Sequence, residues 1–496
     1  MISINKEKRE NIISWVLVAI GAIVYISLVF NRNVWLDEAF TASLVRTDMA
    51  GVLERSMADT LPPLYNIILK ISTDIFGYKV PVMKLTSVLP MIITMIISAT
   101  TVRKRHGFKA SCLFTVALFT MPNLLFFGVE IRMYSLGFLF ATASGIYAYE
   151  FIMDYNKKNL IIFTVLSVLA GYSHHFAFVS VGFVYLFLLL YYFLMERENI
   201  KRWFICVGLT VILYFPCLVV TLKQFKSVSG YFSMPDVTLP VFIKYMRYPY
   251  TVGNTVASIM LLVSVASLAC FTVYKIVSAI RTANSLVKVT TEDVDNDYSA
   301  NMSNISEKYD VKDVYALSMF LVYYGVLLFG TIVSKLMTAN IFVDRYLFFA
   351  HGMLWLFFAI EAGQLKKFYY GMIAVFIFAG VCGYINEVKI EYDTNPDALV
   401  SFLEDSVDDG DILYTIEDSE EMAFCLPFYD EGLTNYEDLD EALKAAKSND
   451  SELWLTIIDY SEYDFKELSE RGLKAEYEDT FTFDRYTFDM YKVISE

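Results

Sequence analysis

Four groups of reactive side chains stand at the ends of apolar runs in this 496-residue sequence, where they could bind anions or move protons. The groups are Asp37 and Glu38 in NVWLDEAF, Glu130, Arg132 and Tyr134 in GVEIRMYS, His174 and His175 in GYSHHF, and Lys335, Asp344 and Arg345 in SKLMTANIFVDRYL. Carboxylates and imidazoles accept protons, and guanidinium groups hold oxyanions through two parallel hydrogen bonds. Ionisable groups at membrane boundaries are functional candidates by default.

Each group also has a purely structural explanation. Acidic residues just outside a span are ordinary, Glu130 and Arg132 can pair with each other, and Arg345 can anchor to lipid headgroups. Adjacent helical residues point in different directions, so at most one of His174 and His175 is expected to line a cavity. A shared location for all four groups is therefore what favours a functional site.

The elements that must position these side chains are membrane helices. The chain is 56% hydrophobic and 19% charged, whereas a soluble domain averages about 45–50% apolar and about 25% charged residues. The apolar residues fall in runs of roughly 20, which cross about 30 Å of hydrocarbon as a helix. We predict an α-helical polytopic membrane protein with eleven spans. They lie at approximately 11–30, 81–102, 110–127, 133–153, 159–175, 177–195, 203–221, 252–274, 313–334, 346–363 and 368–386.

The segment Leu61–Gly77 is predicted to lie in the membrane interface. Lys70 and Asp74 would each cost about 2.5–3.5 kcal/mol at the centre of a span, and their spacing places them on one helical face. The run 11–30 lacks a small-residue cleavage site and is predicted to be retained as the first span. A cytoplasmic amino terminus puts the basic turns, such as Arg103–Lys109, inside the cell. Eleven spans then place all four groups and the tail on the extracytoplasmic side.

Two domains are predicted, a transmembrane domain (1–387) and an acidic soluble α/β domain (388–496). Residues 31–80 form an extracytoplasmic first loop with the interfacial helix, and residues 281–312 form a flexible cytoplasmic loop. The tail holds 31 Asp and Glu against 8 Lys and Arg, which argues against nucleic acid as a partner. Its strand-like runs DILYTI, ELWLTIIDY and YTFDMYKVI alternate with a helix-like stretch at Leu439–Lys447, as in a small α/β domain.

Metal and disulfide chemistry have little support in the sequence. The six cysteines show no metal-ligand spacing, and only Cys425 lies in the tail, so that domain has no internal disulfide. The sequence indicates no specific cofactor. A divalent metal is left open, because Asp37, Glu38 and a histidine could supply oxygen and nitrogen ligands.

The order WLDEAF, DTLPPLYNIILKISTDIFG, EIRMYS, YSHHF and DRYL resembles the polytopic protein-O-mannosyltransferase-like glycosyltransferases. These share the C-type membrane glycosyltransferase fold with the aminoarabinose transferases of lipid A. The resemblance covers most of Trp35–Tyr346 and is strongest in its first third. The chain departs from many relatives at Leu61, where they carry a polar or basic residue before the Pro-Pro pair.

The resemblance implies a polyprenyl-phosphate-linked sugar as donor and a hydroxyl of a lipid, glycan or protein as acceptor, outside the cytoplasm. Asp37 would be the catalytic base, with Glu38 beside it, and a single displacement would invert the anomeric centre. A lipid phosphate leaving group needs positive charge where its oxygen becomes negative. The implied substrate-binding residues are Arg132, Tyr134, His174, His175, Arg345 and Lys335.

Other functions fit the same sequence features. A transporter or flippase of lipid-linked sugars would also be polytopic, but such proteins often contain internal repeats and bind at the midplane, and no repeat is evident. A non-catalytic membrane assembly protein could use the acidic tail as its binding module. A glycan polymerase would act on longer lipid-linked repeats. Asp37→Asn separates the transferase from the first two, since only a transferase should lose turnover while still binding its donor.

Overall fold

The computed structural model describes residues 2–228, 236–252, 254–291, 310–337, 340–416, 422–459, 463–483 and 486–495. The chain divides into two compact units. The first comprises Met1–Leu28, Leu53–Ile68 and Leu85–Glu387, and the second comprises Val29–Val52, Leu69–Lys84 and Val388–Glu496. The C-terminal tail therefore forms one compact unit with two segments of the loop that follows the first helix.

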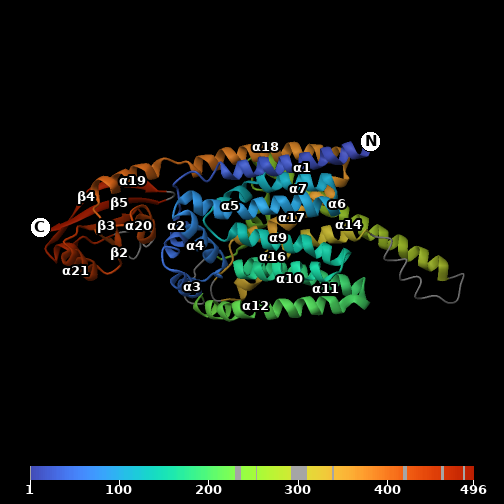
Figure 1. Ribbon diagram of the computed structural model, residues 1–496, viewed down its shortest axis with the longest axis horizontal. Coiled ribbons are helices and arrows are strands. Elements are labelled where there is room, and N and C mark those ends of the chain that lie inside the picture. Colours follow the sequence, from blue (N-terminus) through green and yellow to red (C-terminus); the bar gives the residue numbers. More distant parts are fainter. Residues whose placement is uncertain are drawn as a thin grey trace. The chain divides into compact units, whose positions relative to one another are not determined.

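Long apolar helices form the membrane body, and those of the first unit run alongside one another (Figure 1). They are α1 (Ile2–Ile26), α5 (Val80–Ile97), η1 (Ser98–Val102), α6 (Arg103–His106), α7 (Phe108–Thr120), α8 (Pro122–Val129), α9 (Tyr134–Met153), α10 (Lys157–Ser173), α11 (His175–Leu194), η2 (Arg197–Asn199), α12 (Ile200–Val228), α13 (Leu239–Arg247), η3 (Tyr248–Tyr250), α14 (Thr255–Thr291), α16 (Val311–Leu336), η4 (Asp344–Leu347), α17 (Phe348–Gln364) and α18 (Lys366–Glu391).

The described helices include nine that are long and apolar enough to cross a membrane, or ten if α7 and α8 count as one bent span. The predicted polytopic helical fold is confirmed, with a smaller span count than eleven. The difference is α10, whose 17 residues fall just short of an 18-residue apolar window. At 1.5 Å per residue this helix is about 25 Å long, near the lower limit for a span.

The predicted span 110–127 is broken. Met121 ends α7 in an extended conformation, Pro122 begins α8, and the two helices differ in direction by 63°. Proline suits the first position of a helix but cannot continue the preceding one, because it lacks an N–H and clashes with the earlier turn. The bend therefore follows from one residue.

The predicted loop 281–312 begins too early, because α14 continues through Thr291. The stretch RTANSLVKV is polar, yet it contains no proline or glycine and is compatible with a helix. Residues 292–309 of the predicted loop lie outside the described residues.

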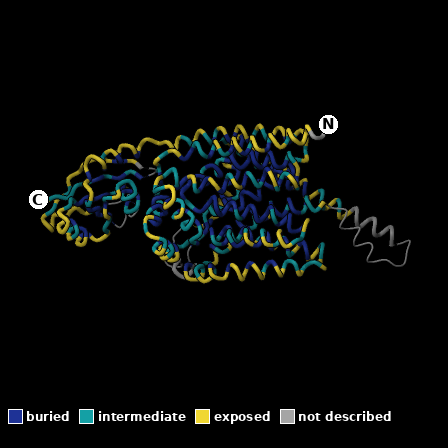
Figure 2. The backbone as a smooth tube through the Cα atoms, in the orientation of Figure 1, coloured by how far each residue is buried: buried dark blue, intermediate teal, exposed yellow. Residues whose placement is uncertain are grey.

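Burial in the first unit separates inner helices from lipid-facing ones (Figure 2). In α9 and α17 most residues are buried. The helix α12 instead exposes large apolar side chains such as Phe204, Ile212 and Phe215. Exposed apolar side chains on a long helix are expected where the surrounding solvent is hydrocarbon.

Three short helices follow α1: α2 (Leu36–Leu44), α3 (Met49–Ala58) and α4 (Leu64–Phe76). The 13 residues of α4 are too few to span the bilayer, as predicted for Leu61–Gly77. Lys70 donates to Asp74 at 2.6 Å on its surface. Lys70 is 13% exposed and Asp74 is 54% exposed, and a partly buried charge pair of this kind suits a helix at the membrane interface.

The tail folds as a mixed sheet with helices, which confirms the predicted α/β domain. Its elements are α19 (Asn395–Ser406), β1 (Ile412–Thr415), α20 (Met422–Tyr429), β2 (Thr434–Tyr436), α21 (Leu439–Asn449), β3 (Leu453–Ile458), α22 (Lys466–Ser469), β4 (Leu473–Phe483) and β5 (Tyr486–Ser495). The strand order is β2-β1-β3-β5-β4, parallel on the β1 side and antiparallel on the β5 side. Leu455, Ile412 and Ala442 belong to its buried core.

Candidate functional site

Helix ends and the connections beside them bring several predicted site residues together within the first unit. Arg132 lies between α8 and α9, and Tyr134 begins α9. His174 joins α10 to α11, and Arg345 lies in η4 just before α17. These four side chains form what we call the cationic cluster.

A tight turn sets the position of Arg132. The amide of Arg132 donates to the carbonyl oxygen of Glu130 at 2.7 Å, and the Glu130 side chain is only 3% exposed. Arg132 itself is partly buried. The turn thus places a guanidinium and a carboxylate in the protein interior, where charge interactions are stronger than in water.

Tyr134 contributes a phenol to the cluster. It is fully buried, and its ring packs against Phe127 and Phe349 with centroids 4.9 and 6.0 Å apart. The charges of Arg345 and Arg132 both act on its phenol. Among the described residues its hydroxyl has no hydrogen-bond partner. A buried hydroxyl without a partner is costly, so this phenol is able to donate to a ligand.

His174 has a fixed orientation. It caps α11, and its Nδ1 accepts a hydrogen bond from the backbone amide of Phe176 at 3.0 Å. Because Nδ1 is an acceptor, the proton of the neutral ring lies on Nε2. His174 is 1% exposed, and its Nε2 has no partner in the part of the chain that the structure describes. It therefore offers a second buried donor, and the charges of Arg132 and Arg345 act on its ring.

Arg345 is held in the short helix η4. Its amide donates to Asp344 Oδ1 at 3.0 Å, and its guanidinium carbon lies 6.0 Å from the centroid of the Tyr346 ring. Asp344 also pairs with Lys244 at 3.2 Å, which connects η4 to α13. The Tyr346 ring in turn packs against His174, with centroids 5.0 Å apart.

Tyr248 lies near the cationic cluster, and sequence analysis did not single it out. Burial, together with the nearby carboxylate of Asp344, holds the pKa of Tyr248 well above its usual value. Its phenol therefore stays protonated and able to donate. The charges of Glu130 and Arg345 also act on it. Nothing in the sequence distinguishes this tyrosine, since the chain contains 35 of them.

Two predicted substrate-binding residues, His175 and Lys335, are not part of the cationic cluster. The His175 ring centroid lies 6.3 Å from that of His174, but its polar contacts are different: its Nε2 lies 3.2 Å from the carbonyl oxygen of Thr60, and it also interacts with Gln224. This agrees with adjacent residues facing different ways. Lys335 is exposed near the end of α16, and no contact among the described residues links it to the cationic cluster.

The predicted catalytic carboxylates lie on α2, in the second unit. Glu38 is 4% exposed and accepts a hydrogen bond from the backbone amide of Trp35 at 3.1 Å, so it closes the first turn of the helix. Asp37 is partly exposed, and its backbone carbonyl accepts a bond from Thr41 Oγ1 at 2.8 Å. The structure thus gives Glu38 a positioning contact and leaves Asp37 the more accessible of the two.

The tail braces α2 within the second unit. Phe40 packs edge-on against Phe424 of α20, with ring centroids 5.3 Å apart. Arg46 Nη1 donates to the carbonyl oxygen of Pro427 at 2.8 Å. Tyr429 donates to the carbonyl oxygen of Arg32 at 3.3 Å. The helix that bears Asp37 therefore packs directly against the C-terminal domain.

The described residues show no cluster of side chains that could bind a metal ion. Within the described ranges no group of three or more His, Cys, Asp or Glu side chains could hold a metal ion. Asp37 and Glu38 alone would supply an incomplete ligand set.

The cationic cluster can bind an oxyanion. Two guanidinium groups supply charge, and Tyr134 and His174 supply two buried neutral donors. A phosphate offers enough acceptor oxygens to satisfy such a set, and arginine binds it through paired hydrogen bonds.

The fold of this chain is similar to that of a protein of known structure. No family model and no curated protein matches the chain. The crystal structure of ArnT from Cupriavidus metallidurans in the apo state is similar, with a TM-score of 0.51 and 12% sequence identity over 96% of this chain and 97% of that chain. ArnT from the same organism bound to undecaprenyl phosphate gives a TM-score of 0.48 at the same identity and coverage. The apo structure confirms the predicted fold, that of the aminoarabinose transferases, over nearly the whole chain.

Proposed function

We propose that this chain is an inverting glycosyltransferase of the extracytoplasmic membrane face. It would move a sugar from a polyprenyl-phosphate donor to a hydroxyl of a lipid, glycan or protein. One observation carries the proposal: two buried donors, Tyr134 Oη and His174 Nε2, have no partner among the described residues and lie beside the charges of Arg132 and Arg345.

The composition of the cluster favours a phosphate ester. Arginine and neutral donors in a buried site match the several oxygens of a phosphate. The surrounding rings of Phe127, Phe348 and Phe349 are apolar, and such walls suit the hydrocarbon next to a lipid-linked phosphate. The ArnT-like fold supports this class of donor by analogy alone.

The proposed reaction is a single displacement. The acceptor hydroxyl oxygen forms a bond to the anomeric carbon, and the bond from that carbon to the phosphate oxygen breaks. The departing phosphate keeps the electron pair, and Arg132 and Arg345 stabilise its charge. Asp37 takes the hydroxyl proton, a role worth typically 10²–10⁴-fold in rate. Glu38 holds the first turn of α2, which carries Asp37.

The proposal also assigns the domains and the orientation of the chain in the membrane. Residues 1–387 supply the transferase domain, 31–80 its first outer loop, and 388–496 an extracytoplasmic domain that braces this loop. The amino terminus is proposed to lie in the cytoplasm. Fusing a compartment-specific reporter after Glu496 tests the orientation, and a cytosolic signal would contradict it.

The decisive experiment combines binding and turnover. Purified wild-type chain is incubated with a labelled polyprenyl-phosphate sugar and with a lipid and glycan extract, and mass spectrometry identifies any new glycoside. Donor binding is measured separately on the wild type and on Asp37→Asn. We expect transfer by the wild type, and donor binding without transfer by the variant. A transporter or an assembly protein would show no new glycoside, with the wild type or with the variant.

The same assay tests the metal question. Treatment with EDTA followed by addition of Mg²⁺, Mn²⁺ or Ca²⁺ should leave transfer unchanged if side chains alone stabilise the leaving phosphate. Loss of transfer with recovery by one cation would instead assign a metal to the reaction.

A further inference from the structure

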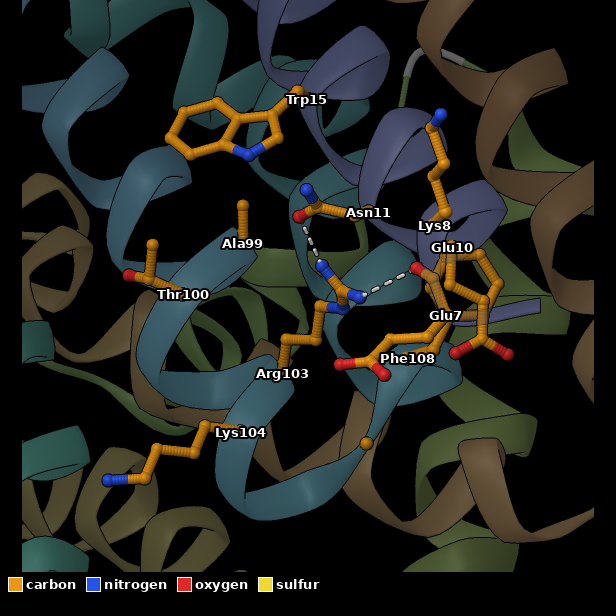
Figure 3. A pocket seen from close by; sticks show the side chains of 11 residues that line it. Glu7, Lys8, Glu10, Asn11, Trp15, Ala99, Thr100, Arg103, Lys104 and Phe108 are labelled. Atoms are coloured by element: carbon orange, nitrogen blue, oxygen red, sulfur yellow. Dashed lines mark hydrogen bonds between the residues drawn. The ribbon is translucent and has the colours of Figure 1, made fainter. Parts of the chain in front are cut away.

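A pocket of about 830 Å³ opens in the first unit beside the start of α1 (Figure 3). Its charged and polar lining consists of Glu7, Lys8, Glu10, Asn11, Arg103 and Lys104. The volume lies within the range of about 300–1,000 Å³ that is typical of small-molecule sites. These residues take no part in the proposed transfer reaction.

An irregular helical turn builds one wall of this pocket. Residues Ser98–Val102 form a π-helix, and two of its members, Ala99 and Thr100, line the pocket. The turn is tied to α7: Ser98 Oγ donates to the carbonyl oxygen of Ser111 at 3.1 Å, and Ser111 Oγ donates back to that of Ser98 at 2.8 Å. Short π-helical turns often mark functional positions. The two hydrogen bonds between Ser98 and Ser111 hold this wall in place.

Arg103 is oriented by α1 but keeps binding capacity. Its Nη1 donates to Asn11 Oδ1 at 2.6 Å, and its Nη2 donates to the carbonyl oxygen of Glu7 at 3.4 Å (Figure 3). Neither Arg103 nor Lys104 forms an ion pair with any carboxylate that the structure describes. A guanidinium has five N–H donors, so three of those on Arg103 stay available to a ligand.

Charges of both signs face this one pocket. Lys8, Arg103 and Lys104 supply positive charge, and Glu7 and Glu10 supply negative charge. Glu10 lies 3.9 Å from Lys6, a long and partly exposed ion pair that contributes little. The two glutamates would repel a purely anionic ligand. A ligand with a phosphate and an ammonium group matches both sets.

On the side of Trp15 the pocket continues along exposed apolar residues of α1. Trp15 lines the pocket and is 44% exposed. Ile12, Val16 and Ile23 of the same helix are exposed as well. Tryptophan is enriched at the level of the lipid headgroups. An occupant with a polar head and apolar chains would therefore contact both parts of α1.

We propose that this pocket binds a zwitterionic glycerophospholipid of the phosphatidylethanolamine type. Arg103 and Lys104 hold its phosphate, Glu7 and Glu10 hold its ammonium group, and its acyl chains follow Trp15 and the exposed face of α1. Basic pockets between membrane helices are known to bind lipid headgroups on the cytoplasmic side, which is where the predicted orientation places this one. The proposal is independent of the proposed transferase activity.

The test compares lipid retention by the purified, delipidated full-length chain in native mass spectrometry. Equimolar phosphatidylethanolamine, phosphatidylglycerol and diacylglycerol are offered together. We expect the wild type to retain phosphatidylethanolamine most strongly. The double variant R103Q/K104Q should retain it about tenfold less, because hydrogen bonds to a charged group are lost. The matched control K157Q/K158Q removes two exposed lysines at the start of α10 and should behave as the wild type.

A second variant keeps the proposal testable if R103Q/K104Q does not fold. E7Q/E10Q removes the ammonium partners but keeps Arg103, so it should lose the preference for phosphatidylethanolamine over phosphatidylglycerol. Equal retention of these two lipids by the wild type would overturn the proposal. So would retention by R103Q/K104Q that matches the K157Q/K158Q control, or an unchanged preference in E7Q/E10Q.

Discussion

The imidazole of His174 stacks on the ring of Phe349, with centroids 4.3 Å apart and planes 26° from parallel. The hydrogen bond from the Phe176 amide holds the same imidazole at Nδ1. One contact fixes the plane of the ring and the other fixes its tautomer. Together they present the Nε2 proton as a prepositioned donor next to the two arginines of the cationic cluster.

Replacing His174 with phenylalanine should weaken donor binding about tenfold or more, because the aromatic packing is kept while the Nε2 donor to the phosphate is lost. Titration of a polyprenyl phosphate followed by protein fluorescence measures the change. His175→Gln is the control, since glutamine can still donate to the Thr60 carbonyl. Wild-type affinity in His174→Phe would exclude Nε2 as a ligand contact.

Replacing Arg345 or Arg132 with lysine should lower kcat/KM by about 10²-fold each, because lysine keeps the charge but cannot grip a phosphate through two parallel bonds. Steady-state kinetics with a labelled donor measure the effect. Lys335→Gln is the matched control, because this exposed residue has no described contact with the cluster, and we expect it to change kcat/KM less than twofold. A loss at Lys335 equal to that at Arg345 would count against the cluster as the phosphate site.

The two neighbouring carboxylates should respond differently to substitution. Asp37→Asn should reduce kcat by about 10²–10⁴-fold with unchanged donor affinity, as expected for loss of a general base. Glu38→Gln preserves an acceptor for the Trp35 amide and should retain most activity. Glu38→Ala removes it and should lower the free energy of unfolding by about 0.5–2 kcal/mol, the cost typical of a lost helix cap. Equal loss of kcat in Asp37→Asn and Glu38→Gln would contradict this division of roles.

The sequence predicted the elements with strong local patterns. The apolar runs became helices, and the predicted strands in the tail correspond to β1, β3 and β5. The long strand β4 was missed because the alternation of Leu473, Ala475 and Tyr477 with charged residues breaks at Asp479. It forms because its backbone pairs with β5 along nearly its whole length, a tertiary contact that outweighs local preference.

Part of the site was also predictable, because some of its residues stand out in the local sequence pattern. Arg132, His174 and Arg345 are charged or polar residues at the ends of apolar runs, which is a visible pattern. Tyr248 carries no such mark, because its position near the cluster depends on the fold, which buries it close to Asp344. The capping role of Glu38 was not predicted, because Trp35, the residue before α2, is an unusual N-cap residue.

The contact between α2 and α20 should influence turnover. Arg46→Gln removes the bond to the Pro427 carbonyl and loosens the brace on the helix that carries Asp37, so we expect kcat to fall several-fold at unchanged donor affinity. Kinetics and donor titration on the same sample separate the two. Arg471→Gln removes an exposed pairing with Asp440 elsewhere in the tail and should leave kcat unchanged. A fall in donor affinity without a change in kcat would contradict the brace.

A buried ion pair joins two parts of the second unit that are distant in sequence. Lys84 of α5 pairs with Glu391 at the end of α18, and both side chains are nearly inaccessible. Asn31 completes the network, since its Nδ2 donates to Glu391 Oε2 at 2.9 Å and its Oδ1 accepts from Lys84 at 3.1 Å.

Removing one charge of this pair should be far more damaging than removing both. Lys84→Met leaves the Glu391 carboxylate buried without its cation, which costs about 3–5 kcal/mol in comparable pairs. The double variant K84M/E391L replaces both charges with apolar groups of similar size, a change that is often neutral or stabilising. Thermal unfolding in detergent should therefore show a large fall in Tm for Lys84→Met and recovery in K84M/E391L. If the double variant unfolds at the same low temperature as Lys84→Met, the network with Asn31, rather than the charge pair, holds these segments together.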